Sequence, residues 1–170
     1  MMCGITGTPG TGKSVVADEL IRRGHTVVHL GAIVKPYVIG EDEERDTRVI
    51  DIDRLAAEFE PVDGFIEGHF AHLVPCDRVV VLRCRPDEIG KRLKKRKYRD
   101  KKICENMDAE ALDVCLIETV ERYDPSLILE LDTTGRDPAY CADRIELFAK
   151  GDIPASFGTN DWSSFAGVQM

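Results

Sequence analysis

A pattern that could bind phosphate lies close to the first residue of the chain. Residues 7–14 read Gly-Thr-Pro-Gly-Thr-Gly-Lys-Ser, which has the spacing G-x-x-x-x-G-K-S. Glycines such as Gly10 and Gly12 let successive backbone N–H groups curl around a phosphate, because no Cβ stands in the way. Lys13 can reach the β- and γ-phosphates of a nucleotide, and the hydroxyl of Ser14 can bind Mg²⁺. The pattern therefore predicts a site for a nucleoside triphosphate with Mg²⁺.

The residues on either side of this pattern suit the elements that such a loop needs. The apolar residues 3–6 are suited to a buried strand, and residues 14–23 are suited to a helix that stops at Gly24. A phosphate would then sit at the helix N-terminus, where unpaired N–H groups and partial positive charge favour an anion. Val15, in the first turn of this helix, is included among the predicted cofactor-binding residues.

Length and composition indicate one soluble domain. The chain has 170 residues and a mass of 19.0 kDa. It has no apolar run of the roughly eighteen residues that a membrane-spanning helix needs, and no secretory signal pattern at its start. We therefore expect a cytoplasmic protein with no membrane partner. The six cysteines include no C-x-x-C pair and are not spaced with histidines as in a zinc finger, so we expect reduced, mostly buried thiols rather than disulfides or a zinc site.

Charge is distributed unevenly along the chain. The formal net charge is −8, which argues against general affinity for nucleic acids, and no DNA binding is expected. Residues 91–102 nevertheless carry nine basic side chains and a single acid, Asp100, so that this segment carries +8 and the remainder −16. Such a strip is either a solvated helix face with its loop, or an anion clamp or RNA contact.

Alternating apolar strands and amphipathic helices predict the fold class. We expect an α/β protein with a mostly parallel five-stranded sheet and helices on both faces. Further helices are expected to begin at Pro86, at Asp108 as a cap, and at Asp137. The expected strands are residues 3–6, 26–30, 64–68, 78–83 and 126–132, and a short helix is expected at residues 53–59.

Two segments lie outside this regular pattern. Residues 40–46 are too polar for a core and predict an exposed excursion between the second strand and the next helix. Residues 151–170 are rich in Gly and Ser, with isolated aromatic side chains. We expect a flexible or partner-docked tail, and three alternatives stay open for it: disorder, docking on the body through Trp162, or a partner interface.

The joint order of several motifs resembles the nucleoside monophosphate kinases, and within them the small adenylate kinase 6 family. The resemblance covers about residues 3–150 and implies a three-layer fold of the P-loop NTPase class. It further implies a nucleotide kinase domain over residues 1–150, a segment that binds the nucleoside monophosphate at about residues 29–50, and a lid at about residues 95–105. The motifs lie at residues 6–14, 51–54, 66–69 with Pro75, and 81–106.

The resemblance also implies roles for individual residues. Lys35 matches an arginine of the segment that binds the monophosphate, and Arg96 matches an arginine of the lid that contacts ATP. The basic strip then becomes a set of cations for phosphoryl transfer, in which negative charge spreads over the γ-phosphate oxygens. Arg92 stands four residues before Arg96, so both side chains share one helical face and could turn toward the phosphates.

Two further candidates follow the third expected strand. Glu67 stands where the family usually has an aspartate that holds Mg²⁺, often through water, and it is one methylene longer than that aspartate. His69 matches a characteristic histidine of the family and could orient a phosphate or an attacking water. The alternative for His69 is a capping or packing histidine.

The resemblance supports two functions of different classes. The first is an enzyme that uses Mg²⁺ and ATP to phosphorylate AMP, or a related monophosphate, giving two ADP from ATP and AMP. The second is an ATP-driven assembly factor with ATPase activity, in which kinase activity is secondary. It would act in small ribosomal subunit biogenesis and rRNA processing and bind a platform ribosomal protein of the universal eleventh family. The acidic body and residues 41–46 would suit a basic partner, unless those residues form an ordinary solvated loop. A weaker third alternative is a kinase for another small substrate.

Overall fold

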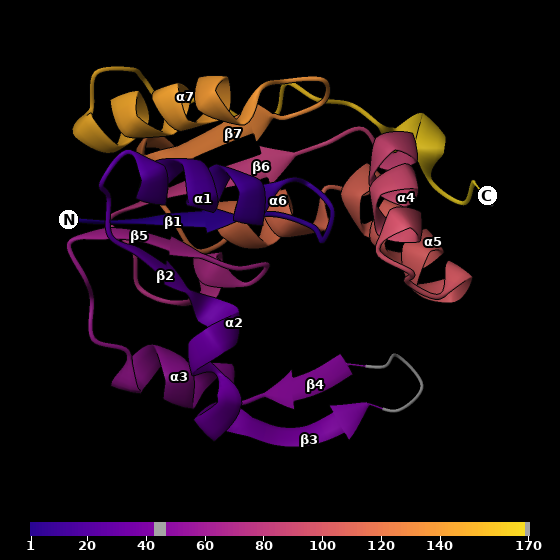
Figure 1. The fold of residues 1–170 in the computed structure, drawn as a ribbon, viewed down its shortest axis with the longest axis horizontal. Coiled ribbons are helices and arrows are strands. Elements are labelled where there is room, and N and C mark those ends of the chain that lie inside the picture. The colour runs from indigo at the N-terminus through magenta and orange to yellow at the C-terminus, as the bar shows by residue number, and fades with distance from the viewer. Residues whose placement is uncertain (43–46, 169–170) are drawn as a thin grey trace.

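A parallel sheet of five strands forms the centre of the computed structural model, which describes residues 1–42 and 47–168. The strand order is β2-β5-β1-β6-β7, and every neighbouring pair is parallel (Figure 1). This arrangement confirms the predicted fold class. The strands are β1 (Met2–Thr6), β2 (Val27–His29), β5 (Gly64–Glu67), β6 (Arg78–Arg83) and β7 (Ile128–Asp132).

Helices cover both faces of this sheet, which explains why its central strands are apolar throughout. Along β6, Val80 and Leu82 pack toward α1 (Lys13–Arg22) and α7 (Pro138–Lys150). The alternate side chains of β6, Val79 and Val81, pack against α6 (Val114–Val120). Beside α6, the face over β5 is covered by α2 (Leu30–Ile33) and α3 (Ile52–Glu58), which bury Leu30 and Leu55.

The polar excursion between β2 and α3 carries regular structure. Strands β3 (Val38–Asp42) and β4 (Thr47–Ile50) pair antiparallel, apart from the five-stranded sheet (Figure 1). Gly40 and Glu41 are exposed, as the polar composition predicts, and they lie in register with Val49 and Arg48 of β4. Residues 43–46, which include most of the acidic run, lie outside the described residues.

The basic segment joins two helices that lie side by side at one end of the sheet (Figure 1). Helix α4 (Pro86–Lys95) is followed by a short connection and then α5 (Asp100–Ala111). The expectation that Asp108 caps a helix is wrong, because Asp108 lies inside α5. The break comes instead at Asp113, whose φ of 57° ends the regular helix and whose carboxylate pairs with Arg83.

The C-terminal residues lie on the chain's own body. Gly151, with φ of 83°, ends α7, and Ser156 then forms a parallel bridge with Leu129 of β7. Trp162 lies over the guanidinium of Arg83. Thr159 also contacts the body, because its backbone N–H donates to Glu130 of β7 at 2.9 Å. Among the described residues, no helix is long and apolar enough to cross a membrane.

The core between α1, α7 and the sheet yields a first prediction. Phe148 of α7 is fully buried in this core, whereas its neighbour Leu147 is 37% exposed. Phe148→Ala should lower the free energy of unfolding by about 3–5 kcal/mol, because it removes a buried ring and leaves a cavity. Leu147→Ala, the matched control, should cost less than about 1 kcal/mol. Urea unfolding measures both, and equal losses for the two variants would contradict this placement of the core.

Candidate active site

The phosphate-binding pattern forms a loop between β1 and α1 whose backbone requires glycine. Gly7, Gly10 and Gly12 have φ values of 138°, 98° and 96°. A Cβ on Gly7 would lie 2.3 Å from the carbonyl oxygen of Leu82, so no other residue fits there without moving β6. Helix α1 begins at Lys13 without a side-chain cap. Its first N–H groups are therefore available to an anion.

Lys13 is folded back onto the loop. Its Nζ donates to the carbonyl oxygens of Gly7 at 2.7 Å and Thr8 at 3.0 Å. The pKa of Lys13 is lowered to about 8, chiefly by burial with a smaller contribution from the positive charge of Arg96, while Cys115, Glu67 and Glu110 act in the opposite direction. The ammonium group is therefore mostly charged at neutral pH and sits at the position where a phosphate would enter the loop.

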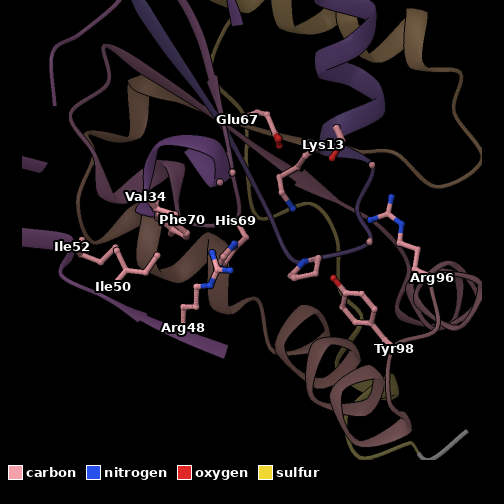
Figure 2. Close-up of a pocket in the computed structure, with 16 residues that line it drawn as sticks. Lys13, Val34, Arg48, Ile50, Ile52, Glu67, His69, Phe70, Arg96 and Tyr98 are labelled. Carbon is pink, nitrogen blue, oxygen red and sulfur yellow. The ribbon is translucent and has the colours of Figure 1, made fainter. Parts of the chain in front are cut away.

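A cavity of about 600 Å³ opens beside the loop. Figure 2 shows Lys13, Glu67 and His69 at one part of its wall and Arg96 with Tyr98 at another. The loop after β1, the loop after β5, strand β4 and the connection after α4 all contribute to this wall. An apolar part of the lining consists of Val34, Ile50, Ile52 and Phe70.

A second cavity, of about 370 Å³, lies along the start of α1 and is also lined by the loop. Val15 and Arg92 line it, together with residues that follow β7, namely Thr133, Arg136 and Pro138. Gly10, Gly12 and Arg96 line both cavities. The phosphate loop therefore separates two compartments, and Arg96 faces both of them.

Glu67 and Ser14 line the first cavity together. The Glu67 carboxylate is largely buried, and its Oε1 lies 3.0 Å from Nδ1 of His29 at the end of β2. A hydroxyl and a carboxylate beside a phosphate loop are the oxygen ligands that Mg²⁺ prefers, with phosphate and water in the remaining places. The residues present therefore fit Mg²⁺.

Two histidines after β5 occupy different environments. The His69 side chain reaches solvent at the cavity, and its ring meets Phe70 edge-on at 4.5 Å between centroids. The surrounding walls desolvate the ring and lower its pKa to about 4, with added repulsion from Lys13, His72 and Lys102, so it is neutral at pH 7. His72 is buried between Thr6 at 2.7 Å and Glu118 at 2.9 Å, which is the environment of a structural histidine.

Of the two remaining predicted residues, Arg92 lines a cavity and Lys35 does not. Arg92 donates to the carbonyl oxygen of Gly10 at 3.1 Å and so holds the loop as well as lining the second cavity. Lys35 is exposed and is not among the described residues that line either cavity. Arg48 of β4 lines the first cavity instead, and sequence reasoning missed it. The available signal was strand alternation, because Arg48 and Ile50 are two apart and face the same side.

Comparisons with known proteins show which family the chain resembles over nearly its full length. Residues 3–113 match the family described as AAA domain. A protein of Natronomonas pharaonis named "putative adenylate kinase" is 42% identical over 166 residues, covering 96% of this chain and 98% of the relative. Proteins of the same name from Archaeoglobus fulgidus and Methanothermobacter thermautotrophicus are each 39% identical, covering 96% and 97% of this chain and 93% and 98% of the relatives.

Solved structures show a similar fold at low sequence identity. Deoxyadenosine kinase from M. mycoides superposes with a TM-score of 0.61 at 14% identity, over 90% of this chain and all of that one. Thymidylate kinase from Candida albicans gives a TM-score of 0.54 at 12% identity, over 89% and 91% of the two chains. At such identities the likeness concerns the fold alone.

The lowered pKa of Lys13 predicts how nucleotide binding depends on pH. Above about pH 8 the ammonium loses its proton, so the affinity for ATP should fall by up to about tenfold per pH unit. Lys13→Arg is the matched control, because a guanidinium stays charged throughout this range. Calorimetric titration from about pH 6.5 to about pH 9.5 measures both proteins. The same decline in Lys13→Arg would show that another group causes it.

Proposed function

Because the chain belongs to the adenylate kinase family of these relatives, we propose that it transfers the γ-phosphoryl group of Mg²⁺-bound ATP to AMP or a closely related nucleoside monophosphate. The observation that carries this proposal is the pair of cavities on the two sides of one phosphate loop, with Arg96 facing both. A phosphotransferase between two nucleotides needs one compartment for the donor and another for the acceptor. An enzyme that only hydrolysed ATP would need no second nucleotide site.

The donor fits the phosphate loop and the second cavity. The triphosphate would lie along the N–H groups at the start of α1, with Lys13 beside its outer phosphates. The base and ribose would lie between Arg92 and the residues after β7, where Thr133 and Pro138 line the cavity. In this orientation the γ-phosphate points toward the first cavity.

The acceptor fits the first cavity. Arg48 supplies a cation for the monophosphate, since its guanidinium can form paired hydrogen bonds with phosphate oxygens. The apolar part of the lining, with Ile50, Ile52 and Phe70, offers a surface for a base. The cavity volume of about 600 Å³ is within the range of small-molecule sites.

The transfer forms a bond from an acceptor phosphate oxygen to the γ-phosphorus and breaks the bond from that phosphorus to the oxygen bridging to the β-phosphate, so that ADP leaves. Lys13 and Arg96 would balance the charge on the transferred group, while Arg92 would hold the loop through the carbonyl of Gly10. Mg²⁺, held through Ser14 and Glu67, would neutralise phosphate charge. His69, neutral at pH 7, would donate or accept a hydrogen bond at this point without adding charge.

A second function, implied by the resemblance, is ATP hydrolysis in the cytoplasm by a factor for small ribosomal subunit assembly and rRNA processing. Two observations favour it. A neutral His69 at the cavity could orient water for attack on the γ-phosphate. The charge of −16 outside residues 91–102 would attract a basic ribosomal protein such as the platform protein named above.

Product analysis separates the two functions. Purified protein is incubated with Mg²⁺ and ATP, with and without AMP, and the nucleotides and free phosphate are measured by chromatography and a phosphate assay. We expect ADP to form quickly only with AMP, with AMP consumed in step. Lys13→Ala is the control for contaminating kinases. Slow phosphate release that depends on Lys13 and is unchanged by AMP would contradict the kinase and favour the assembly ATPase.

The position of Arg48 predicts which cation binds the acceptor. Arg48→Ala should raise KM for AMP about tenfold or more, because it removes a charged hydrogen-bond donor from the first cavity. Lys35→Ala, in the same chain segment but outside the cavity lining, is the matched control and should change KM for AMP little. Steady-state kinetics at saturating ATP measures both. A larger effect at Lys35 would restore the residue that the sequence favoured.

A further inference from the structure

A fully buried ion pair lies below the phosphate loop and takes no part in the chemistry above. Arg83, the last residue of β6, and Glu110 of α5 are each 1% exposed, and Nε of Arg83 lies 2.8 Å from Oε1 of Glu110. A second guanidinium nitrogen donates to the backbone carbonyl of Glu110 at 3.0 Å. The free energy needed to remove the two charges from water offsets much of their attraction, so the pair by itself is weak evidence for a gain in stability. Its partners suggest another role.

Glu110 connects this pair to the phosphate loop. Its Oε2 accepts a hydrogen bond of 2.5 Å from the hydroxyl of Thr8, and its Oε1 accepts one of 3.0 Å from the backbone N–H of Cys84. The carbonyl of Thr8 in turn accepts hydrogen bonds from Lys13 and from the hydroxyl of Thr11. One carboxylate therefore joins α5 and the end of β6 to the residue on which Lys13 rests.

The other sides of Arg83 face the tail. Its Nη1 donates to Glu130 of β7 at 2.6 Å, and Oε2 of Glu130 accepts from the backbone N–H of Thr159 at 2.9 Å. The indole of Trp162 covers the guanidinium, with 4.9 Å from Cζ to the ring centroid. Stacking of a guanidinium on an aromatic face is attractive, and more so where water is excluded. The tail thus closes the solvent side of a buried cation.

Residues 156–168, which we name the C-terminal clasp, are anchored at both ends. At one end Ser156 exchanges backbone hydrogen bonds with β7, accepting from Glu130 at 2.7 Å and donating to Ile128 at 3.2 Å. At the other end the N–H of Gly167 donates to Asp108 of α5 at 2.8 Å. The clasp therefore runs from the edge of the sheet to the helix that carries Glu110 (Figure 1).

We propose that Arg83 and Glu110 are positioning residues for the phosphate loop, and that the C-terminal clasp fixes them through Trp162. The docked clasp fixes Arg83, and Arg83 in turn fixes Glu110. Glu110 then holds Thr8, whose carbonyl accepts a hydrogen bond from Lys13. Because such coupling is reciprocal, a docked clasp strengthens ATP binding and bound ATP strengthens docking. The inference rests on the proposed function for the identity of the nucleotide and concerns the donor side alone.

Steady-state kinetics of clasp variants tests the proposal. Trp162→Ala should raise KM for ATP about fivefold or more, with KM for AMP unchanged and a smaller change in kcat. Trp162→Phe, which keeps an aromatic face over Arg83, should restore most of the affinity. Ser164→Ala, an exposed position in the clasp, is the control. Unchanged KM for ATP in Trp162→Ala, with lower thermal stability alone, would overturn the proposal.

A double-mutant cycle tests whether Trp162 acts through Thr8. Thr8→Val removes the hydroxyl that Glu110 accepts while keeping a branched side chain, and it should also weaken ATP binding. If Trp162 and Thr8 belong to one network, the affinity of the double variant for ATP should be about equal to that of the single variant with the lower affinity. Additive losses would overturn the connection. The cycle changes neither Arg83 nor Glu110, so it does not depend on variants of the buried pair that could fail to fold.

Fluorescence gives a measurement that does not depend on phosphoryl transfer. Trp162 is the single tryptophan of the chain, so its emission reports the clasp directly. Iodide quenching should decrease when Mg²⁺ and ATP are added to the wild type, and this protection should be lost in Thr8→Val at matched ATP saturation. Protection without any phosphorylation of AMP would refute the kinase and leave the clasp standing. Phosphorylation of AMP without protection of Trp162 would support the kinase and overturn the proposal for the clasp.

Discussion

Parallel pairing of β1 with β5 and β6 is the constraint on which the rest of this structure depends. It brings the carboxyl ends of the strands to one edge of the sheet, where the phosphate loop follows β1, Glu67 and His69 stand at the end of β5, and Arg83 ends β6. The closeness of this packing is visible at Gly7, where even a Cβ would meet the backbone of β6. The site exists because chain segments far apart in sequence end at the same place.

The charged side chains at this edge of the sheet are of two kinds. Some line the cavities, and others are buried beneath the loop and position its residues. Lys13 donates to backbone carbonyls of the loop and Arg96 lines both cavities, so an incoming phosphate can bind both cations. Arg83 is a cation of the same formal charge, but three acids surround it and Trp162 covers it. The contrast lies in desolvation, because a buried charge with fixed partners positions its neighbours and cannot exchange them for a ligand.

Much of the site could be predicted from the sequence because its motifs are local. The glycine spacing of the loop and the buried strand before it predicted the turn, the helix and the phosphate position together. Tertiary packing overrode other expectations. The helix expected from Asp108 is interrupted at Asp113, since this residue turns toward Arg83, thirty residues earlier in the chain. The family resemblance pointed to Lys35 and missed Arg48, because only the pairing of β3 with β4 brings Arg48 to the cavity.

The sequence by itself determined the fold class, the phosphate loop and the family of this protein, because those depend on periodicity and on residues adjacent along the chain. The tertiary structure decided which side chains share a cavity, that the C-terminal residues lie on the body, and that Glu110 reaches Thr8 across an interval of 102 residues. Such contacts leave no periodic signal, since they depend on how separate elements meet in space. Composition predicted a flexible or partner-docked tail, and in the structure one indole and a few backbone hydrogen bonds hold it against the body.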